Sequence, residues 1–144
     1  SANAVQVQKF CDQFSKMVQQ AVIESPWVPG VHEYLKSNHV LQDFILITAT
    51  PQEEIEQILD ALEIAFYFKE VHGAPKTKSI VVNDVLSRLN CSPEQALIIG
   101  DSKTDLKAAE ENNVDFLLRR TPFNKELQQQ FQGPSVESLN FKAQ

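Results

Sequence analysis

The sequence has little of what several classes of protein require. Its 144 residues include only two cysteines, four glycines and one tryptophan. Cys11 and Cys91 do not form a CxxC or another metal-ligand spacing, which favours free thiols in a reducing, cytoplasmic setting. No apolar run reaches the roughly 18 residues of a transmembrane helix, and the polar residues near the start argue against a secretory signal peptide.

Basic residues are also scarce. The chain has 13 lysines and arginines against 19 aspartates and glutamates, which gives a formal net charge of −6 at pH 7. This balance argues against a nucleic-acid interface, which needs a basic surface, and no membrane partner is expected. A small anionic substrate remains compatible, because a local site can oppose the net charge of the whole protein.

The first part of the chain has a helical pattern. Apolar residues recur along one face, which predicts a helix over residues 4–24: Phe10, Phe14, Met17, Val18, Ala21 and Val22. The prolines of the run 25–30 end it, because proline disfavours a helix at its own position and at the preceding one. We therefore expect a boundary between a helical, cap-like segment, residues 1–25, and an α/β core, residues 26–144.

In the core, short apolar runs alternate with helical patterns. Consecutive apolar residues are typical of buried strands in a parallel sheet, and they occur at residues 44–48, 97–100 and 116–118, with a shorter extended piece at 66–71. The helices between these runs predict right-handed crossovers. The expected fold is therefore α/β, with a doubly wound, Rossmann-like parallel sheet.

Two helix starts have recognisable capping residues. Thr50 and Glu53 have the spacing of a capping box, with Pro51 at the first helical position. Asn124 is of a type that caps helices, and it precedes a short helical pattern near the end of the chain.

Polar side chains follow the predicted strands at their carboxyl ends, where ligands bind in open α/β sheets. Thr48 ends one strand, Lys76 or Lys78 opens the next helix, and Asp101 and Asp105 follow the central strand. Hydroxyl and amide groups can bind phosphate oxygens near a helix start. An ammonium group offsets phosphate charge, and carboxylates are ligands that Mg²⁺ prefers. Together these groups suit the chemistry of a phosphoryl group.

Each of these residues also has a purely structural interpretation. Asp101 can cap the following helix while Asp105 is a solvated acid in its first turn. Thr48 can satisfy the end of a strand, and either lysine can lie on the surface beside a turn. Gly100 is expected to let the backbone turn sharply where the strand ends. The order of the polar residues and their common location favour the functional interpretation.

The order of these motifs resembles the haloacid dehalogenase-like (HAD) phosphohydrolases, and within them the phosphoglycolate phosphatase and phosphomutase branch. The resemblance covers about residues 26–120. It is carried by Ile47-Thr48-Ala49-Thr50, by a lysine that opens a helix (Lys76 or Lys78), and by Ile98-Ile99-Gly100-Asp101-Ser102-Lys103-Thr104-Asp105.

The resemblance implies roles for particular residues. Thr48, with the backbone of Ala49, would bind phosphate, and Lys78 would orient the phosphate and the nucleophile. Asp101 and Asp105 would serve a Mg²⁺ site. The earlier lysine of the pair stays open as the alternative to Lys78.

One family feature is missing. HAD enzymes carry an Asp-x-Asp at the end of their first core strand, ahead of the cap, and the first of these aspartates attacks phosphorus. The seven aspartates here include no pair at that spacing: Asp12, Asp43, Asp60, Asp84, Asp101, Asp105 and Asp115. The nucleophile and the first core strand are therefore expected to be absent from this chain.

Three explanations of that absence remain open. The sequence can be a piece of a longer enzyme, or a natural relative that binds phosphate or a partner without turnover. The missing strand can also come from another chain or from residues 3–8. An open gap in the sheet would leave strand edges unpaired, which favours a homo-oligomer.

The function expected from the sequence is that of a HAD-like, Mg²⁺-dependent phosphatase that acts on a small phosphorylated metabolite through a phospho-aspartate. This chain alone is expected to be inactive. The alternative is a non-catalytic HAD-like binding or assembly module. Arg119 and Arg120 follow the last clear strand, and we interpret them as a solvated pair in a loop rather than as a substrate anchor.

Overall fold

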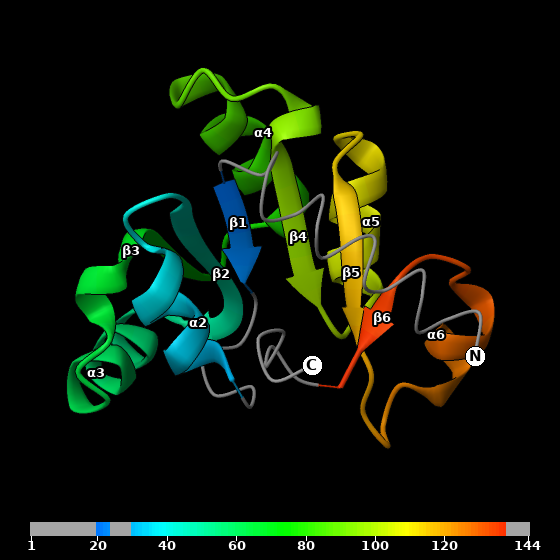
Figure 1. The fold of residues 1–144 in the computed structure, drawn as a ribbon, viewed down its shortest axis with the longest axis horizontal. Coiled ribbons are helices and arrows are strands. Elements are labelled where there is room, and N and C mark those ends of the chain that lie inside the picture. The colour runs from blue at the N-terminus through cyan, green and yellow to red at the C-terminus, as the bar shows by residue number, and fades with distance from the viewer. Residues whose placement is uncertain (1–19, 24–29, 138–144) are drawn as a thin grey trace.

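The described part of the chain forms one parallel sheet of six strands. The computed structural model describes residues 20–23 and 30–137. The strands lie in the order β3-β2-β1-β4-β5-β6, and every neighbouring pair is parallel (Figure 1). The elements are β1 (Gln20–Ile23), α2 (Val31–Asn38), β2 (Asp43–Pro51), α3 (Gln52–Ala61), β3 (Phe68–Ala74), α4 (Lys78–Arg88), β4 (Ala96–Gly100), α5 (Lys103–Glu111), β5 (Asp115–Arg119), α6 (Lys125–Gln130) and β6 (Ser135–Val136).

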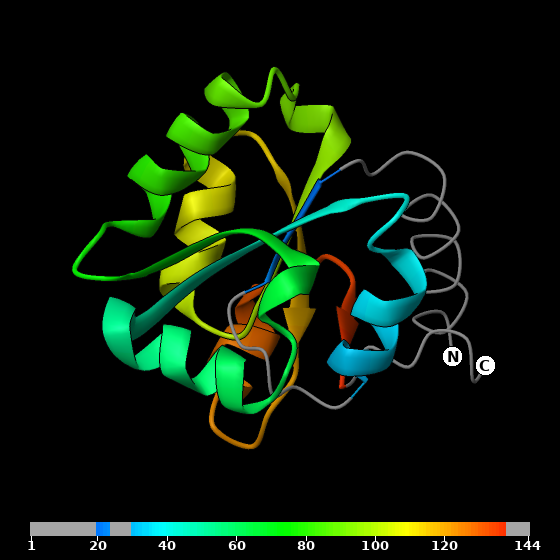
Figure 2. The ribbon, with the colours of Figure 1, turned by 90° about the vertical axis from the view of Figure 1, so that its left-hand side faces the viewer.

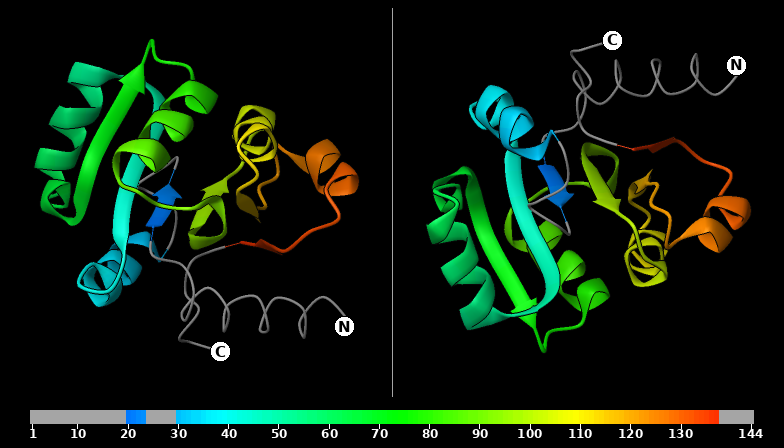
Figure 3. Two further views of the ribbon diagram at one scale, coloured as in Figure 1. Left: turned by 90° about the horizontal axis from the view of Figure 1, so that it is seen from above. Right: turned by 90° about the horizontal axis from the view of Figure 1, so that it is seen from below.

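Helices cover both faces of this sheet. Side chains of α2 and α3 share one buried cluster with one face of the strands, and side chains of α4, α5 and α6 share a second cluster with the other face. In Figures 2 and 3, α2 accordingly lies on the opposite side of the strands from α4 and α5. The prediction of a doubly wound parallel α/β fold is confirmed.

The first core strand is present, which corrects one expectation from the sequence. β1 lies between β2 and β4, where Val22 is in register with Ile45 on one side and Ile98 on the other. The sheet therefore has no gap at this place, and the predicted helix does not extend to residue 24. Residues 1–19 and 24–29 lie outside the described residues, and with them the rest of that helix and the predicted domain boundary.

Tertiary contacts explain why Gln20–Ile23 form a strand where a helix was predicted. Ala21, Val22 and Ile23 are three consecutive apolar residues, a pattern that suits a strand buried on both faces as well as the end of an amphipathic helix. In the sheet, Val22 enters one cluster while Ala21 and Ile23 enter the other, and all three are at most 4% exposed. Pairing these residues also satisfies the backbone groups of β2 and β4, which would be costly to bury unpaired.

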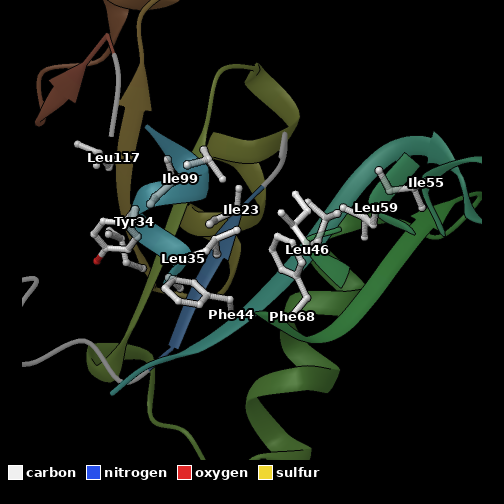
Figure 4. Close-up of a cluster of buried hydrophobic side chains, with 14 of the residues drawn as sticks. Ile23, Tyr34, Leu35, Phe44, Leu46, Ile55, Leu59, Phe68, Ile99 and Leu117 are labelled. Atoms are coloured by element: carbon white, nitrogen blue, oxygen red, sulfur yellow. The ribbon is translucent and has the colours of Figure 1, made fainter. Parts of the chain in front are cut away.

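The cluster that β1 shares with α2 and α3 is shown in Figure 4. Ile23 lies there among Leu35, Leu46 and Ile99, each at most 3% exposed. Complete burial of an aliphatic side chain contributes about 1.5–3 kcal/mol relative to exposure. Ala21 and Ile23 of β1 thus join this cluster, while Val22 joins the cluster on the other face.

The start of α3 differs from the predicted one. The helix begins at Gln52, and Pro51 occupies the N-cap position as well as the end of β2. No side-chain capping hydrogen bond forms there, so the capping box expected of Thr50 and Glu53 is wrong. The cause is that β2 continues past Thr48 and pairs Pro51 with Ala74 of β3.

An ion-pair cluster joins β3 to α4. The guanidinium of Arg88 donates from Nη1 and Nη2 to the two carboxylate oxygens of Glu70, at 2.9 and 2.7 Å, and from Nε to Asp84 at 2.7 Å. The hydrogen bonds from Arg88 lower the pKa of Glu70 to about 2. A carboxylate with a lowered pKa stabilises the fold at pH values above its unfolded pKa, and this contribution is lost as the pH falls through the folded pKa.

Glu70→Gln should therefore reduce stability in a pH-dependent way. At pH 7 we expect the thermal midpoint to fall by about 2–4 °C, a modest effect because solvent screens the partly exposed pair. The difference in thermal midpoint between Glu70→Gln and the unmodified chain should shrink as the pH falls from 4.5, the ordinary pKa of a glutamate, to about 2. Thermal scans across this range test it. Asp43→Asn is the control, because its ion pair with Lys69 is half-exposed and 3.5 Å long; a constant difference at all pH values would contradict the assignment.

The fold bears on membrane crossing and on the expected homo-oligomer. Among the described residues, no helix is long and apolar enough to cross a membrane. The gap on which the expected homo-oligomer depended is closed by β1, and the two outer strands of the described sheet are β3 and β6.

Candidate active site

The candidate site lies at the carboxyl edge of the parallel sheet. In Figure 1, the arrowheads of β1, β4 and β5 point to the same edge. Thr48 ends the buried part of β2, and Asp101 follows β4 directly. Because β1 lies between β2 and β4, the strands that lead to Thr48 and Asp101 are about 10 Å apart across the sheet.

The corner between β4 and α5 is organised by the carboxylate of Asp105. Oδ2 of Asp105 accepts hydrogen bonds from the backbone N–H of Asp101 (3.2 Å) and of Ser102 (3.1 Å), and from the Ser102 hydroxyl (2.7 Å). Ser102 in turn caps α5 by accepting from the N–H of Asp105. The structural interpretation of Asp101 as the helix cap is wrong, because Ser102 is the cap. The interpretation of Asp105 as a solvated acid is also wrong, because Asp105 is only 2% exposed.

Gly100 is required here by space and not by a special backbone conformation. Of the described glycines only Gly30 has a positive φ, so Gly100 does not use the left-handed conformation that favours glycine. A Cβ at Gly100 would instead lie 2.5 Å from Oδ2 and 2.6 Å from Cβ of Asp105. The missing side chain lets the first turn of α5 approach the end of β4.

Lys78 is the lysine that reaches this corner. Lys78 is the first residue of α4, and its Nζ lies 2.8 Å from Oδ1 of Asp105, with the two side chains 13% and 3% exposed. The exposed ammonium of Lys76 instead lies 3.3 Å from Nδ1 of His72. The structure therefore brings Lys78 together with Asp105, and it does not bring Lys76 there.

A small, mostly apolar cavity lies beside the ion pair of Lys78 and Asp105. A cavity of about 10 Å³, which has room for about one water molecule, is lined by Lys78, Asp105 and six apolar side chains. The apolar residues are Val22, Ile47, Val82, Ile98, Ile99 and Ala108. Low access to water strengthens the attraction between the two charges.

Thr48 faces its own loop. Its side chain accepts a hydrogen bond from the N–H of Thr50 at 3.2 Å and lies 3.3 Å from the Thr50 hydroxyl, and Thr48 is 5% exposed. Ala49 is exposed. Of the groups expected to bind phosphate, the Thr50 amide is thus engaged within the loop, while Ala49 lies on the surface.

Two further residues approach Asp101 that the sequence did not single out for this place. Nη1 of Arg119, the last residue of β5, lies 3.9 Å from Oδ2 of Asp101, and both side chains are about a quarter exposed. Among the described residues, Nε of Arg119 has no hydrogen-bond partner. The side-chain amide of Asn124 donates to the carbonyl oxygens of Asp101 and Arg119, at 2.9 Å each. A guanidinium at the end of a neighbouring strand is the only signal in the sequence that could have indicated this arrangement.

The donor set fits a divalent cation in part. Asp101 is a partly exposed carboxylate at the carboxyl edge, the kind of ligand that Mg²⁺ uses one or two of while keeping several waters. Asp105 already accepts three hydrogen bonds and an ion pair from the protein. Among the described residues no three His, Cys, Asp or Glu side chains gather as a metal cage. Of the two carboxylates, Asp101 is the one that could hold a cation, with Asp105 behind it.

Comparison with known proteins identifies the family. The model of the haloacid dehalogenase-like hydrolase family matches residues 2–118, so the chain belongs to that family. A phosphoglycolate phosphatase from Salmonella paratyphi A is 37% identical over 71 residues, 44% of this chain and 27% of the relative. A phosphorylated carbohydrates phosphatase from Thermotoga maritima is 30% identical over 99 residues, 64% of this chain and 44% of the relative. The matches thus span less than half of either relative.

A solved structure has the same architecture. The core domain of a Streptococcus pneumoniae TIGR4 protein superposes with a TM-score of 0.65 at 13% identity, covering 88% of this chain and 92% of that one. At this identity the likeness concerns the fold alone.

Proposed function

We propose that this chain carries the phosphate-binding and metal-binding part of a Mg²⁺-dependent phosphatase of the phosphoglycolate phosphatase and phosphomutase branch. The substrate class is a small phosphorylated metabolite. The observation that carries the proposal is the corner where Lys78 contacts Asp105 at 2.8 Å and Asp105 holds the backbone of Asp101. Family membership and the phosphatases among the relatives support it.

Each residue has a role in this proposal. Asp101 would hold Mg²⁺, which supplies charge neutralisation at the phosphoryl group. Asp105 would keep Asp101 and the ammonium of Lys78 in place, and Lys78 would orient the phosphate. Thr48 and the backbone of Ala49 would bind phosphate oxygens from the neighbouring strand.

The nucleophile is the part that this sequence does not supply. In a phospho-aspartate mechanism, a carboxylate oxygen attacks phosphorus and the bond to the leaving-group oxygen breaks; water later hydrolyses the acyl phosphate. β1 has the position from which the family presents this aspartate, but the sequence after Ile23 reads Glu24-Ser25-Pro26, and no aspartate occurs between Asp12 and Asp43. We therefore expect this chain alone to bind and not to turn over.

A second candidate is a non-catalytic HAD-like binding or assembly module. The observation that favours it is a structurally complete six-stranded sheet without an aspartate after β1. The homo-oligomer stays a prediction that light scattering would test. A cytoplasmic location also stays a proposal; it rests on the spacing of Cys11 and Cys91, of which Cys91 is a free thiol.

Turnover and binding assays separate these candidates. With pure chain, Mg²⁺ and p-nitrophenyl phosphate, we expect no metal-dependent release of phosphate, and appreciable release would contradict the assignment of a missing nucleophile. Calorimetric titration with Mg²⁺ should show binding, and inorganic phosphate with Mg²⁺ should raise the thermal midpoint. Absence of both effects would leave only an assembly role.

Asp101→Asn tests the metal assignment directly. Removing the charge of the partly exposed carboxylate should weaken Mg²⁺ binding by at least about tenfold, because a hard cation loses its charged oxygen ligand. The fold should be nearly unaffected, since the Asp101 side chain makes only the 3.9 Å contact with Arg119 among the described contacts. Asp115→Asn, at the opposite end of β5, is the matched control; equal affinity in the two variants would reject Asp101 as a ligand.

A further inference from the structure

The side chain of Asn124 connects the loops that follow β4 and β5. Its Nδ2 donates to the carbonyl oxygens of Asp101 and Arg119, at 2.9 Å each. Its Oδ1 accepts from the N–H of Thr121 at 2.9 Å and from Nε2 of Gln128 at 2.6 Å. An asparagine amide offers two donors and two acceptor positions, so all four are used.

This use differs from the one expected of Asn124. The residue stands at the N-cap position of α6, but its side chain forms no capping hydrogen bond to that helix. Its two donors reach across the carboxyl edge of the sheet to the carbonyl oxygen of Asp101, just after β4, and to that of Arg119, at the end of β5. The acceptor that a cap would use, Oδ1, is taken by Thr121 and Gln128, and the two donors join the residue after β4 to the last residue of β5. This pair of bonds fixes the spacing of those two chain segments.

Asp101 is held by this amide from one side and by Asp105 from the other. Asp101 belongs to the two-residue link between β4 and α5, so no regular element restrains it. Its N–H donates to Oδ2 of Asp105 at 3.2 Å, and its carbonyl oxygen accepts from Asn124 at 2.9 Å. Holding both peptide groups of a residue fixes the direction of its Cα–Cβ bond, from which the carboxylate extends. Asn124 and Asp105 thus restrain the origin of the Asp101 side chain through its backbone, and neither of these bonds uses the carboxylate.

The same amide holds the backbone of the residue whose guanidinium lies beside that carboxylate. Asn124 holds the backbone of Arg119, whose guanidinium lies 3.9 Å from Asp101. At this distance the guanidinium is too far for a hydrogen bond to Asp101. The spacing leaves Asp101 oxygens available to a divalent cation while a fixed positive charge remains next to it.

We propose that Asn124 is a positioning residue for the divalent-cation site, acting through the backbone of Asp101 and Arg119. The inference rests on the proposed function, in which Asp101 holds Mg²⁺. Positioning residues behind a metal ligand commonly change metal affinity by about 10–100-fold when they are replaced. Asn124 never touches the cation, so its effect must appear as a change in affinity in a chain that is still folded.

The experiment compares Asn124 with Asn38 by the same substitutions. Asn38 also donates its amide to a backbone carbonyl, that of Tyr34 at 2.9 Å, but it lies at the end of α2, before β2 begins. Asn124→Ala removes the whole clip. Asn124→Asp keeps an acceptor for Thr121 and Gln128 and loses both donors, which keeps the test valid if the alanine variant does not fold.

Calorimetric Mg²⁺ titrations of the full chain, well below each thermal midpoint, give the readout. We expect both Asn124 variants to bind Mg²⁺ about tenfold more weakly, although the added charge of Asn124→Asp by itself favours a cation. Asn38→Ala and Asn38→Asp should keep the original affinity within about twofold, even where their thermal midpoints fall. Unchanged affinity in both Asn124 variants would overturn the inference.

Different results would contradict the metal role of Asp101 and the positioning role of Asn124. If the unmodified chain binds no Mg²⁺, or if Asp101→Asn binds as well as the unmodified chain, the proposed metal role of Asp101 fails and the inference falls with it. If Asp101→Asn loses binding while the Asn124 variants keep it, the inference alone is wrong. If the Asn38 variants lose affinity equally, the effect is one of general stability, and that result also rejects a positioning role.

Discussion

Asp105→Ala should destabilise the protein more than any other single removal of a polar side chain described above. The Asp105 carboxylate accepts from two backbone N–H groups, one hydroxyl and the ammonium of Lys78, and the residue is 2% exposed. Removing one partner of a buried ion pair typically costs about 3–5 kcal/mol, because the other charge stays in a poorly hydrated place. Urea unfolding monitored by circular dichroism measures this loss as a lower midpoint at unchanged slope.

The control is the other half of the pair. Lys78→Met removes one of the four groups bound to Asp105 and leaves the three hydrogen bonds from Asp101 and Ser102 in place. It should therefore cost less than Asp105→Ala. In the double variant the losses should not add, with a coupling energy of about 1–3 kcal/mol. Strict additivity, or a loss below about 1 kcal/mol for Asp105→Ala, would show that the pair does not organise this corner.

The strands buried by consecutive apolar residues were predictable from the sequence, and β1 was not. β2, β4 and β5 follow runs with no competing period, so the parallel sheet was correctly expected. Ala21 and Val22 continue a helical period that begins at Phe10, and local pattern alone cannot choose between helix and strand. The choice is made by β2 and β4, whose facing backbone groups need a partner.

The candidate site was predictable in its residue types and not in its contacts. Spacing of i and i+4 places Asp101 and Asp105 at one corner, but it does not say that Asp105 turns inward to bind the backbone of Asp101. Lys76 and Lys78 are equivalent by position in the sequence, and only the geometry of α4 directs Lys78 to Asp105. The role of Asn124 depends on the proximity of β4 and β5, which are separated by a helix in the sequence.

Gly100→Ala should destabilise the same corner by a different route. The added Cβ would lie 2.5 Å from Oδ2, 2.6 Å from Cγ and 2.6 Å from Cβ of Asp105. The Asp105 Cβ is fixed by the backbone of α5, so a rotamer change cannot remove the clash. Either α5 moves away from β4 or Asp105 loses its hydrogen bonds, and overpacking of this kind costs about 1–3 kcal/mol before any loss of polar contacts. We expect a total of about 3 kcal/mol or more in urea unfolding, together with weaker Mg²⁺ binding.

Gly133→Ala is the matched control for this substitution. Its Cβ would also meet a side chain, but the atoms it meets belong to the far end of Phe131, a partly exposed ring, and not to a Cβ fixed by a helix backbone. The loss there should stay below that of Gly100→Ala, and Mg²⁺ affinity should not change. If the two variants lose equal stability, the close approach of α5 to β4 is not what selects glycine at position 100. If Gly100→Ala loses stability and keeps full Mg²⁺ affinity, the position of Asp105 does not govern the cation site, and Asp101 must be held by the Asn124 side alone.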